Sequence, residues 1–218
     1  MPAQPISGFI LAGGRSRRMG TNKPQIAWGD GSLVTDAVRR MRQVASRVSV
    51  VGLSGDSPVE VVQDLFPGLG PLAGLHAALV HSVTDWNLVL AVDMPLVTVP
   101  LLKFIAAQCN EKLLAVLTRT TKVSGAPPTG ASPRVGLQPL CAAYHRMLLP
   151  VIEQALSSHE LSIHRLFERL QEGIMNEPSR ALRVIEEPEL AEAGFSSAML
   201  LNVNTPADLE RARALANK

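Results

Sequence analysis

Short apolar runs rich in Val, Ile and Leu alternate along this chain with longer stretches in which apolar residues recur every three or four positions. Such runs are typical of strands buried on both faces, and the longer stretches are typical of amphipathic helices. The pattern predicts strands at residues 7–12, 48–51, 60–62, 88–92, 113–117, 137–144 and 200–203. It predicts helices at residues 32–46, 71–82, 99–110, 147–157, 162–171 and 206–216. This alternation indicates an α/β fold in which helices cover a parallel sheet.

The chain length fits one three-layer α/β/α domain over residues 1–218. Residues 118–136 do not fit a compact connection, because they are rich in Pro, Gly, Ser and Thr and form too long a link for a routine loop. We expect a flexible loop there. It is either a surface excursion without function or a lid that orders over substrate.

Residues 8–23 carry the most informative pattern, because an apolar strand leads directly into a basic, glycine-rich loop. Glycines accept positive φ and let consecutive backbone N–H groups approach an anion. The carboxyl end of a strand is also where open α/β sheets bind ligands. The sequence therefore predicts a triphosphate site formed by Gly13, Gly14, Gly20, Arg15, Arg17, Arg18 and Lys23.

Two familiar phosphate motifs are excluded for this loop. A Walker loop requires a Gly-Lys pair, which is absent from the chain, and neither Gly13 nor Gly14 starts the Gly-x-Gly-x-x-Gly spacing of dinucleotide-binding proteins. Residues 11–23, LAGGRSRRMGTNK, instead match position by position the Leu-Ala-Gly-Gly-x-Ser-x-Arg-Met-Gly-x-x-Lys signature of nucleotidyltransferases.

Two further motifs fit a nucleotide site. The apolar run at 88–92 ends at Asp93, which places a carboxylate at the edge of a sheet where it can hold Mg²⁺ against a phosphate. The string GPLAG at 70–74 predicts a tight turn that opens a helix at Pro71, a helix start that suits an anion or a ribose hydroxyl. Alone, each string is more typical of a turn and a helix start than of a site.

Charge is unevenly distributed along the chain. Residues 1–50 hold eight basic and two acidic side chains, a local charge of +6, although the net charge of the chain is only +2. This near balance excludes a dedicated polyanion binder but not a site for one small polyanion. The two cysteines, Cys109 and Cys141, predict neither a disulfide framework nor a zinc site, and no run is long enough to span a membrane. We therefore expect a soluble, cytoplasmic protein.

The motifs GFILAGGRSRRMGTNK, GPLAG, AVDMP at 91–95, LQPLCAAY at 137–144 and LNVNTPADL at 201–209 occur in the order seen in molybdenum cofactor guanylyltransferases. The chain resembles that family from residue 6 to residue 209. The resemblance implies a Rossmann-like α/β/α sandwich with a mostly parallel sheet. It also implies an enzyme that transfers GMP from GTP to the terminal phosphate of molybdopterin with Mg²⁺, releasing pyrophosphate. The resemblance implies that the protein binds these two substrates and makes transient contacts with cofactor-assembly proteins or molybdoenzymes. It implies binding to neither a membrane nor a nucleic acid.

The resemblance also assigns residues. It implies that the nucleotide is bound by Leu11, Ala12, Gly13, Gly14, Lys23, Asp64 and Asp93, that Asp93 is the metal ligand, and that Asn202 and Asn204 lie towards the pterin. We expect Lys23, Asp93 and Arg18 to be catalytic, through charge neutralisation and not through a general base, because the attacking phosphate is already anionic. The five histidines and both cysteines are expected to be surface or packing residues.

The sequence departs from the family in three places. Gly52 stands where an asparagine often touches the base, Asn22 replaces the usual aspartate before the loop lysine, and residues 118–136 form a longer excursion. The first departure leaves a cytidylyltransferase or another small-molecule nucleotidyltransferase as the alternative function. A non-catalytic nucleotide- or nucleic-acid-binding module is the alternative from another class. The arginines at 39, 40 and 42 favour it slightly, although helix arginines are usually solvated.

Overall fold

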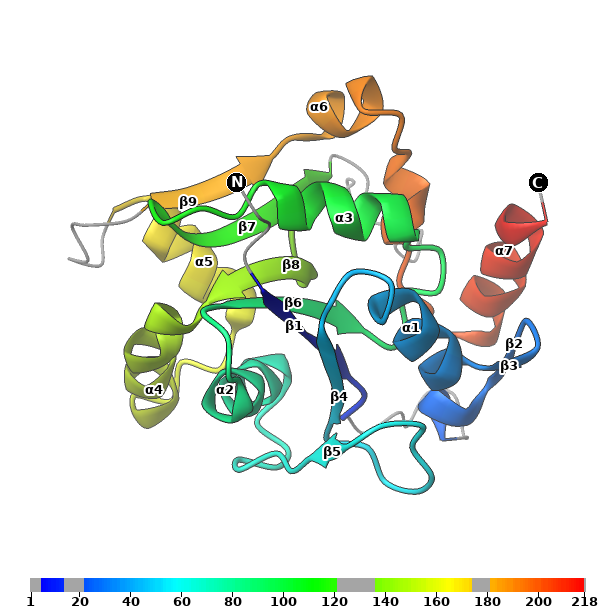
Figure 1. The fold of residues 1–218 in the computed structure, drawn as a ribbon, viewed down its shortest axis with the longest axis horizontal. Coiled ribbons are helices and arrows are strands. Elements are labelled where there is room, and N and C mark those ends of the chain that lie inside the picture. The colour runs from blue at the N-terminus through cyan, green and yellow to red at the C-terminus, as the bar shows by residue number, and fades with distance from the viewer. Residues whose placement is uncertain (1–4, 14–21, 121–135, 174–180, 218) are drawn as a thin grey trace, which may run out of the picture.

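In the computed structural model, the described residues are 5–13, 22–120, 136–173 and 181–217. One sheet crosses the molecule in the order β5-β4-β1-β6-β8-β7-β9 (Figure 1). Among its strands only β8 runs antiparallel to its neighbours, which confirms the prediction of a mostly parallel sheet. The strands are β1 (Ile6–Leu11), β4 (Arg47–Val51), β5 (Val61–Val62), β6 (Trp86–Ala91), β7 (Leu113–Thr120), β8 (Gly136–His145) and β9 (Ala181–Ile185).

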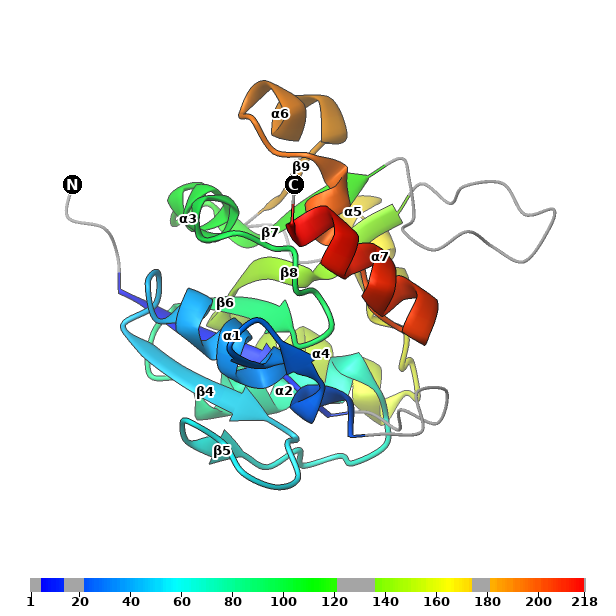
Figure 2. The same cartoon turned by 90° about the vertical axis from the view of Figure 1, so that its right-hand side faces the viewer.

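Helices cover both faces of this sheet and form the outer two layers (Figures 1 and 2). On one face, α1 (Leu33–Met41) and α3 (Val99–Ala107) bury their apolar residues, and α6 (Glu187–Glu192) adds Leu190. On the other face lie α2 (Pro71–His81), α4 (Leu149–Ser157) and α5 (Ile163–Gln171). The predicted three-layer sandwich is therefore confirmed.

A third, smaller cluster lies outside the sandwich. Here α7 (Pro206–Ala216) packs Leu209 and Ala212 against Leu201, Val203 and Trp28. Trp28 belongs to a short antiparallel ladder of β2 (Ala27–Trp28) and β3 (Gly31–Ser32). Figure 1 shows the ladder beside α7, so the C-terminal helix is held against the N-terminal part of the chain.

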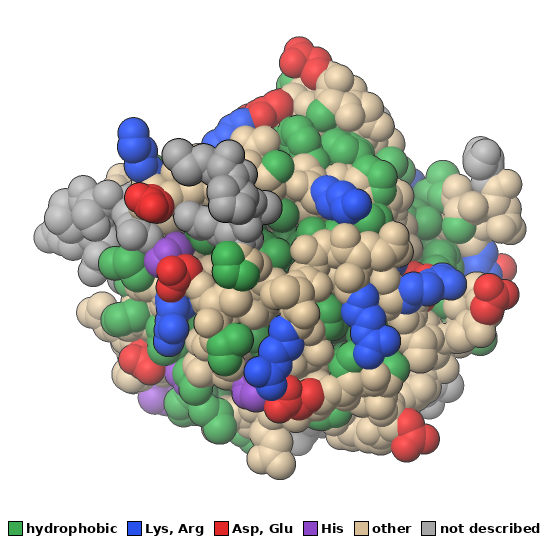
Figure 3. Space-filling model, viewed as in Figure 1, with side chains coloured by type: hydrophobic (Ala, Val, Ile, Leu, Met, Phe, Trp, Pro, Cys, Tyr) green, Lys and Arg blue, Asp and Glu red, His purple; other side chains and the backbone are tan. Residues whose placement is uncertain are grey.

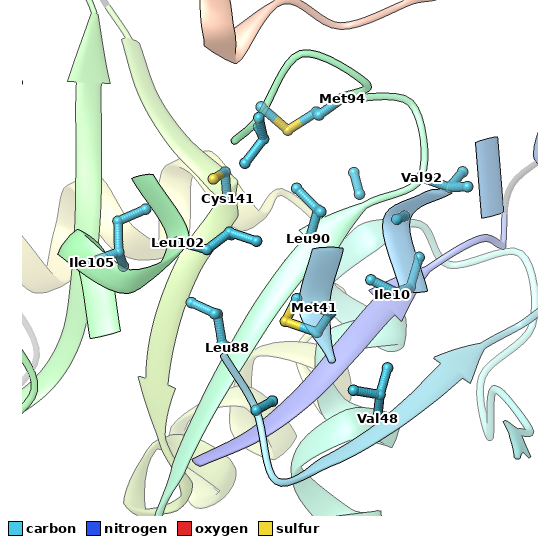
Figure 4. Close-up of a cluster of buried hydrophobic side chains, with 14 of the residues drawn as sticks. Ile10, Met41, Val48, Leu88, Leu90, Val92, Met94, Leu102, Ile105 and Cys141 are labelled. Atoms are coloured by element: carbon cyan, nitrogen blue, oxygen red, sulfur yellow. The ribbon is translucent and has the colours of Figure 1, made fainter. Parts of the chain in front are cut away.

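The strands at the centre of the sheet alternate between the two cores, as expected for strands covered on both sides. In β1, Ile10 belongs to one cluster of buried residues and Phe9 to the other. Figure 4 shows Ile10, Leu88 and Leu90 from β1 and β6 together with Met41 of α1 and Leu102 of α3. The central strands are thus fixed on both faces, so the loops at their ends are held in place.

Several boundaries differ from the sequence prediction. Helix α1 stops at Met41, because the chain then turns so that the Ser46 N–H can donate to the Ile6 carbonyl at the start of β1. Helix α3 ends at Ala107 and α4 begins at Leu149, after a 3₁₀ turn. Strand β7 extends to Thr120, so only residues 121–135 of the expected flexible loop separate it from β8, and they lie outside the described residues.

Other elements were predicted wrongly or not at all. Residues 200–203 form no strand, although Leu200, Leu201 and Val203 are buried, because they pack against a helix or a loop and not within a ladder. Strand β9, helix α6 and the β2–β3 ladder were not predicted. In β9 the half-buried Arg183 interrupts the apolar run, as an edge strand allows. In the described residues, none of the helices has the length and apolar character to cross a membrane.

Candidate functional site

Four neighbouring parallel strands bring predicted site residues to one edge of the sheet. Gly13 follows β1, Gly52 follows β4, Asp64 follows β5 and Asp93 follows β6. The carboxyl ends of parallel strands share an edge, so these four positions line one side of the fold in the order 64, 52, 13, 93. Along the chain, β4 and β5 are added on one side of β1, and β6 is then added on its other side. Open α/β sheets bind ligands where the order of strands changes direction in this way.

Asp93 is held between residues from both ends of the chain. Lys23 Nζ donates to Asp93 Oδ2 at 3.0 Å and to Asn204 Oδ1 at 3.0 Å. The side chains of Lys23 and Asp93 are 12% and 18% exposed, so the ion pair is largely shielded from water. The backbone is tied as well, because the Val203 N–H donates to the Asp93 carbonyl at 2.8 Å. These contacts unite the loop lysine, the strand-end carboxylate and the C-terminal asparagine in one cluster.

The second carboxylate oxygen of Asp93 has no such partner. Asp93 Oδ1 is buried and accepts no hydrogen bond from the residues that the structure describes. A buried carboxylate oxygen without a donor is unfavourable unless a ligand compensates it, and it suits a hard cation. No group of three or more His, Cys, Asp or Glu side chains capable of holding a metal occurs in the described ranges. A cation at this position would therefore depend on Asp93 together with substrate oxygens and water.

The end of β1 lies directly against the residue that follows β4. Gly52 has a φ of +69°, and a Cβ atom placed on it would lie 3.0 Å from the Gly13 Cα atom. A side chain at position 52 would therefore press on the Gly13 backbone, and a glycine avoids this contact. Gly13 itself does not have a positive φ, so that part of the sequence prediction is wrong. Its small size keeps the edge between Gly13 and Gly52 open.

Leu11 and Ala12 are buried at the end of β1, and their backbone groups form hydrogen bonds with the neighbouring segments. The Ala12 N–H donates to the Val51 carbonyl, and the Leu11 carbonyl accepts from the Val92 N–H, both at 3.0 Å. These bonds fix the strand end between Gly52 and Asp93. The two residues therefore shape the floor of the site.

Asp64 borders the site from the far side of Gly52. Its Oδ1 atom accepts from the Phe66 N–H at 2.9 Å, which closes a short turn and leaves Oδ2 for another partner. The turn leads to Gly70, with a φ of +87°, and Pro71 then starts α2. This confirms the turn and helix start predicted from GPLAG. Helix α2 packs on Leu11 at Gly74, where an added Cβ atom would lie in ordinary contact with the Leu11 side chain at 3.5 Å.

The remaining predicted residues fall into two groups. Asn202 is half-buried, and only Val203 separates it from Asn204, whose backbone N–H donates to Asp208 Oδ2. Sequence analysis did not single out Asp208, although Thr205 and Asp208 follow the spacing of a capping box at the start of α7. Gly14 and Arg18, with Gly20, Arg15 and Arg17, lie outside the described residues.

Comparison with known proteins places the chain in a family. Residues 8–174 match the model of the MobA-like NTP transferase domain, which is more than half of the chain. The chain belongs to this family. It is 32% identical over 216 residues to a probable molybdenum cofactor guanylyltransferase of Pelotomaculum thermopropionicum, covering 96% of this chain and 93% of that protein. It is 34% identical to one of Chloroflexus aggregans, covering 96% and 94%.

Solved structures agree on the fold. The molybdopterin-guanine dinucleotide biosynthesis protein A of Archaeoglobus fulgidus superposes with a TM-score of 0.70 at 23% identity, covering 97% of this chain and 98% of that chain. A nucleotidyl transferase of Methanothermobacter gives 0.68 at 21% identity, with coverage of 98% and 99%. The architecture of this MobA-like chain is therefore the one that nucleotidyltransferases share.

Both cysteines of this family member and three of its histidines, His76, His81 and His145, are buried or half-buried. Burial raises the pKa of the Cys109 and Cys141 thiols to about 12, so both are protonated at neutral pH and unreactive. Three histidines pack their rings against aromatic side chains, His76 on Phe66, His81 on Phe9 and His145 on Trp86. Burial lowers the pKa of His164. These contacts agree with the expected packing roles.

Three arginines near the end of α1 were expected to be solvated, and for Arg40 this expectation is wrong. The exposed Arg39 pairs with Asp36, and Arg42 donates to the Pro58 carbonyl at 3.2 Å. The side chain of Arg40 is only 11% exposed and points under the loop that follows Asp93. Figure 3 shows the basic side chains of this face spaced apart, several of them beside acidic ones.

Proposed function

We propose that this protein transfers GMP from GTP to the terminal phosphate of molybdopterin and releases pyrophosphate. The observation that carries this proposal is the cluster of Lys23, Asp93 and Asn204, in which one carboxylate oxygen of Asp93 has no hydrogen-bond partner among the described residues. It lies beside the glycine-lined end of β1, where an α/β sheet binds a ligand. The guanylyltransferase names of relatives that match nearly the whole chain support the same reaction.

The attacking group is a phosphate monoester, which is anionic at neutral pH and needs little help from a base. The difficulty is repulsion between this anion and the triphosphate. Lys23 supplies a cation that is already at the edge of the sheet. Its ammonium group can turn from Asp93 to the phosphates. The loop cation Arg18 and the backbone at Gly14 would add to this stabilisation of the leaving pyrophosphate.

We assign Asp93 as the residue that would hold Mg²⁺, because its Oδ1 atom is a buried, unpaired carboxylate oxygen. When bound, the ion supplies charge neutralisation at the phosphate oxygens. The nucleoside would lie over Leu11, Ala12 and Gly13, with Asp64 beside it. Because Gly52 has no side chain, contacts to the base at this point would come from the backbone or from Ser54, whose backbone carbonyl already accepts from the Asn22 side-chain amide at 3.4 Å.

On the other side of Lys23, Asn204 and Asn202 would contact the pterin. Asn204 Oδ1 accepts from Lys23 in the structure, so movement of the lysine to the phosphates would free this amide for the second substrate. We place the reaction in the cytoplasm, since both cysteines are free thiols and a reduced compartment suits them.

The test is a comparison of nucleotides. The purified protein is incubated with Mg²⁺, a molybdopterin acceptor and either GTP or CTP, and both pyrophosphate and the dinucleotide product are measured. We expect turnover with GTP and at most a few per cent of that rate with CTP. Preference for CTP would assign the cytidylyl reaction instead. Binding of GTP without any product would favour a nucleotide-binding module.

A further inference from the structure

Arg40 is a buried cation in α1 that the proposed reaction does not use. Its Nη1 atom donates to the Met94 carbonyl at 3.3 Å and, over a shorter distance, to the Val97 carbonyl. Its Nε atom lies 2.9 Å from Asp36 Oδ2, where the two charges attract although the N–H direction does not form a hydrogen bond. The guanidinium group therefore connects a helix carboxylate with the loop that starts at Asp93.

Burial of this group is unfavourable in itself. Desolvation lowers the pKa of Arg40, and the nearby Asp36 carboxylate opposes that shift. Asp36 is also buried and is paired with Arg39 as well, so its charge would not be left unpaired without Arg40. An arginine at position 40 is thus not needed to neutralise Asp36. What it adds is a pair of hydrogen bonds to the loop at 94–97.

The same loop sets the direction of the Asp93 carboxylate. Met94 follows Asp93 directly, and its N–H donates to the Ala91 carbonyl, so the chain turns at once after β6. The Val97 N–H donates back to the Met94 carbonyl over a long distance, 3.4 Å. The planar guanidinium holds the two N–H groups of Nη1 in a fixed geometry towards the two carbonyls, whereas the donors of an ammonium group rotate freely.

We propose that Arg40 is a positioning residue, which holds the backbone after Asp93 so that Asp93 Oδ1 faces the cation of the nucleotide site. The inference rests on the proposed role of Asp93 as metal ligand. Arg40 touches neither substrate nor ion and acts through the Met94 and Val97 carbonyls. Groups that orient a metal ligand without touching the metal contribute to metal affinity in this way.

Arg40→Lys is the central variant, and Arg39→Lys is its matched control. Both are the same substitution on adjacent residues that pair with the same carboxylate, but Arg39 does not contact the loop. Binding of Mn²⁺ is measured by electron paramagnetic resonance on the full chain with a non-hydrolysable GTP analogue. We expect Arg40→Lys to raise the Mn²⁺ Kd about tenfold, and Arg39→Lys to leave it within twofold of wild type.

A second readout separates positioning from general damage. With Arg40→Lys the Mg²⁺ concentration for half-maximal GMP transfer should rise by a similar factor, while kcat at saturating Mg²⁺ recovers. A structural defect would instead lower kcat at every Mg²⁺ concentration, and that result would overturn the proposal. Should Arg40→Lys fail to fold, Asp36→Asn weakens the hold on the guanidinium without removing it, and it must also weaken Mn²⁺ binding.

The controls distinguish this inference from the function on which it rests. If Asp93→Asn weakens Mn²⁺ binding and a folded Arg40→Lys does not, the role of Arg40 is wrong and the metal site stands. If Asp93→Asn binds Mn²⁺ as the wild type does, the assignment of Asp93 fails, and the inference about Arg40 fails with it.

Discussion

Two regions of the molecule meet at Asp93, and they are held there in different ways. Four parallel strands in register end at one edge of the sheet, and the residues after them lie side by side there. These residues are Asp64 after β5, Gly52 after β4, Gly13 after β1 and Asp93 after β6. The C-terminal segment delivers Asn204 without a strand, by the bond from Val203 to the Asp93 carbonyl and the contact with Lys23. The proposed nucleotide side is therefore fixed by the core, whereas the proposed acceptor side is held by a few hydrogen bonds.

Lys23 contacts residues of both regions, so its removal should affect both of them. We expect Lys23→Ala to lower kcat/KM for GTP about 10²-fold to 10³-fold, the usual consequence of removing one charged donor to a reacting phosphate. GTP binding and transfer should weaken together. The control is Lys103→Ala, an exposed lysine on α3. Unchanged kinetics in Lys23→Ala, measured by pyrophosphate release, would show that the lysine has no part in the site.

Gly52 tests the rigidity of the nucleotide side. Gly52→Ala should raise the KM for GTP about tenfold, because a strained left-handed alanine also pushes a Cβ atom towards Gly13. Gly55→Ala is the matched control, since Gly55 has a φ of +102° but nothing within 4 Å of its Cβ position. Both variants carry backbone strain, but only one disturbs β1. Equal effects on KM would mean that strain alone, and not the close approach, governs nucleotide binding.

Asn204 tests the acceptor side, where we expect the smallest change. Asn204→Ala removes the amide that contacts Lys23. The KM for the molybdopterin acceptor should rise about fivefold, the factor that corresponds to the free energy of one hydrogen bond. The KM for GTP should stay within twofold of wild type. Asn110→Ala, before β7 at the opposite edge of the sheet, serves as control. A change confined to GTP would place Asn204 with the nucleotide and not with the acceptor.

The two regions also differ in how far the sequence could predict them. The strands on the nucleotide side are short apolar runs, and the residues after them carry motifs, so both the order of elements and the positions of Gly13, Lys23 and Asp93 could be predicted. The shared edge follows because parallel strands end on the same side. The closeness of Gly52 to Gly13 could not be predicted, since it depends on how two strand ends pack.

On the acceptor side local patterns were misleading. The apolar run at 200–203 suggested a strand, but its residues are buried by contact with α7 and the Asp93 loop. The contact between Lys23 and Asn204 joins residues 181 positions apart, and no periodicity indicates it. Arg40 was expected to be solvated, because a charge on an amphipathic helix usually faces water. Its burial depends on a loop that lies over α1 only in the folded chain.

Asp93 provides the most direct test of the central claim that this edge of the sheet performs magnesium-dependent GMP transfer. The measurement is the rate of dinucleotide formation from GTP and a molybdopterin acceptor by Asp93→Ala and by wild type over a range of Mg²⁺ concentrations, with thermal unfolding of both proteins as a check on the fold. We expect the variant to fold as the wild type does and to lose about a thousandfold or more in rate. Turnover near that of wild type at the same Mg²⁺ concentration would contradict the claim.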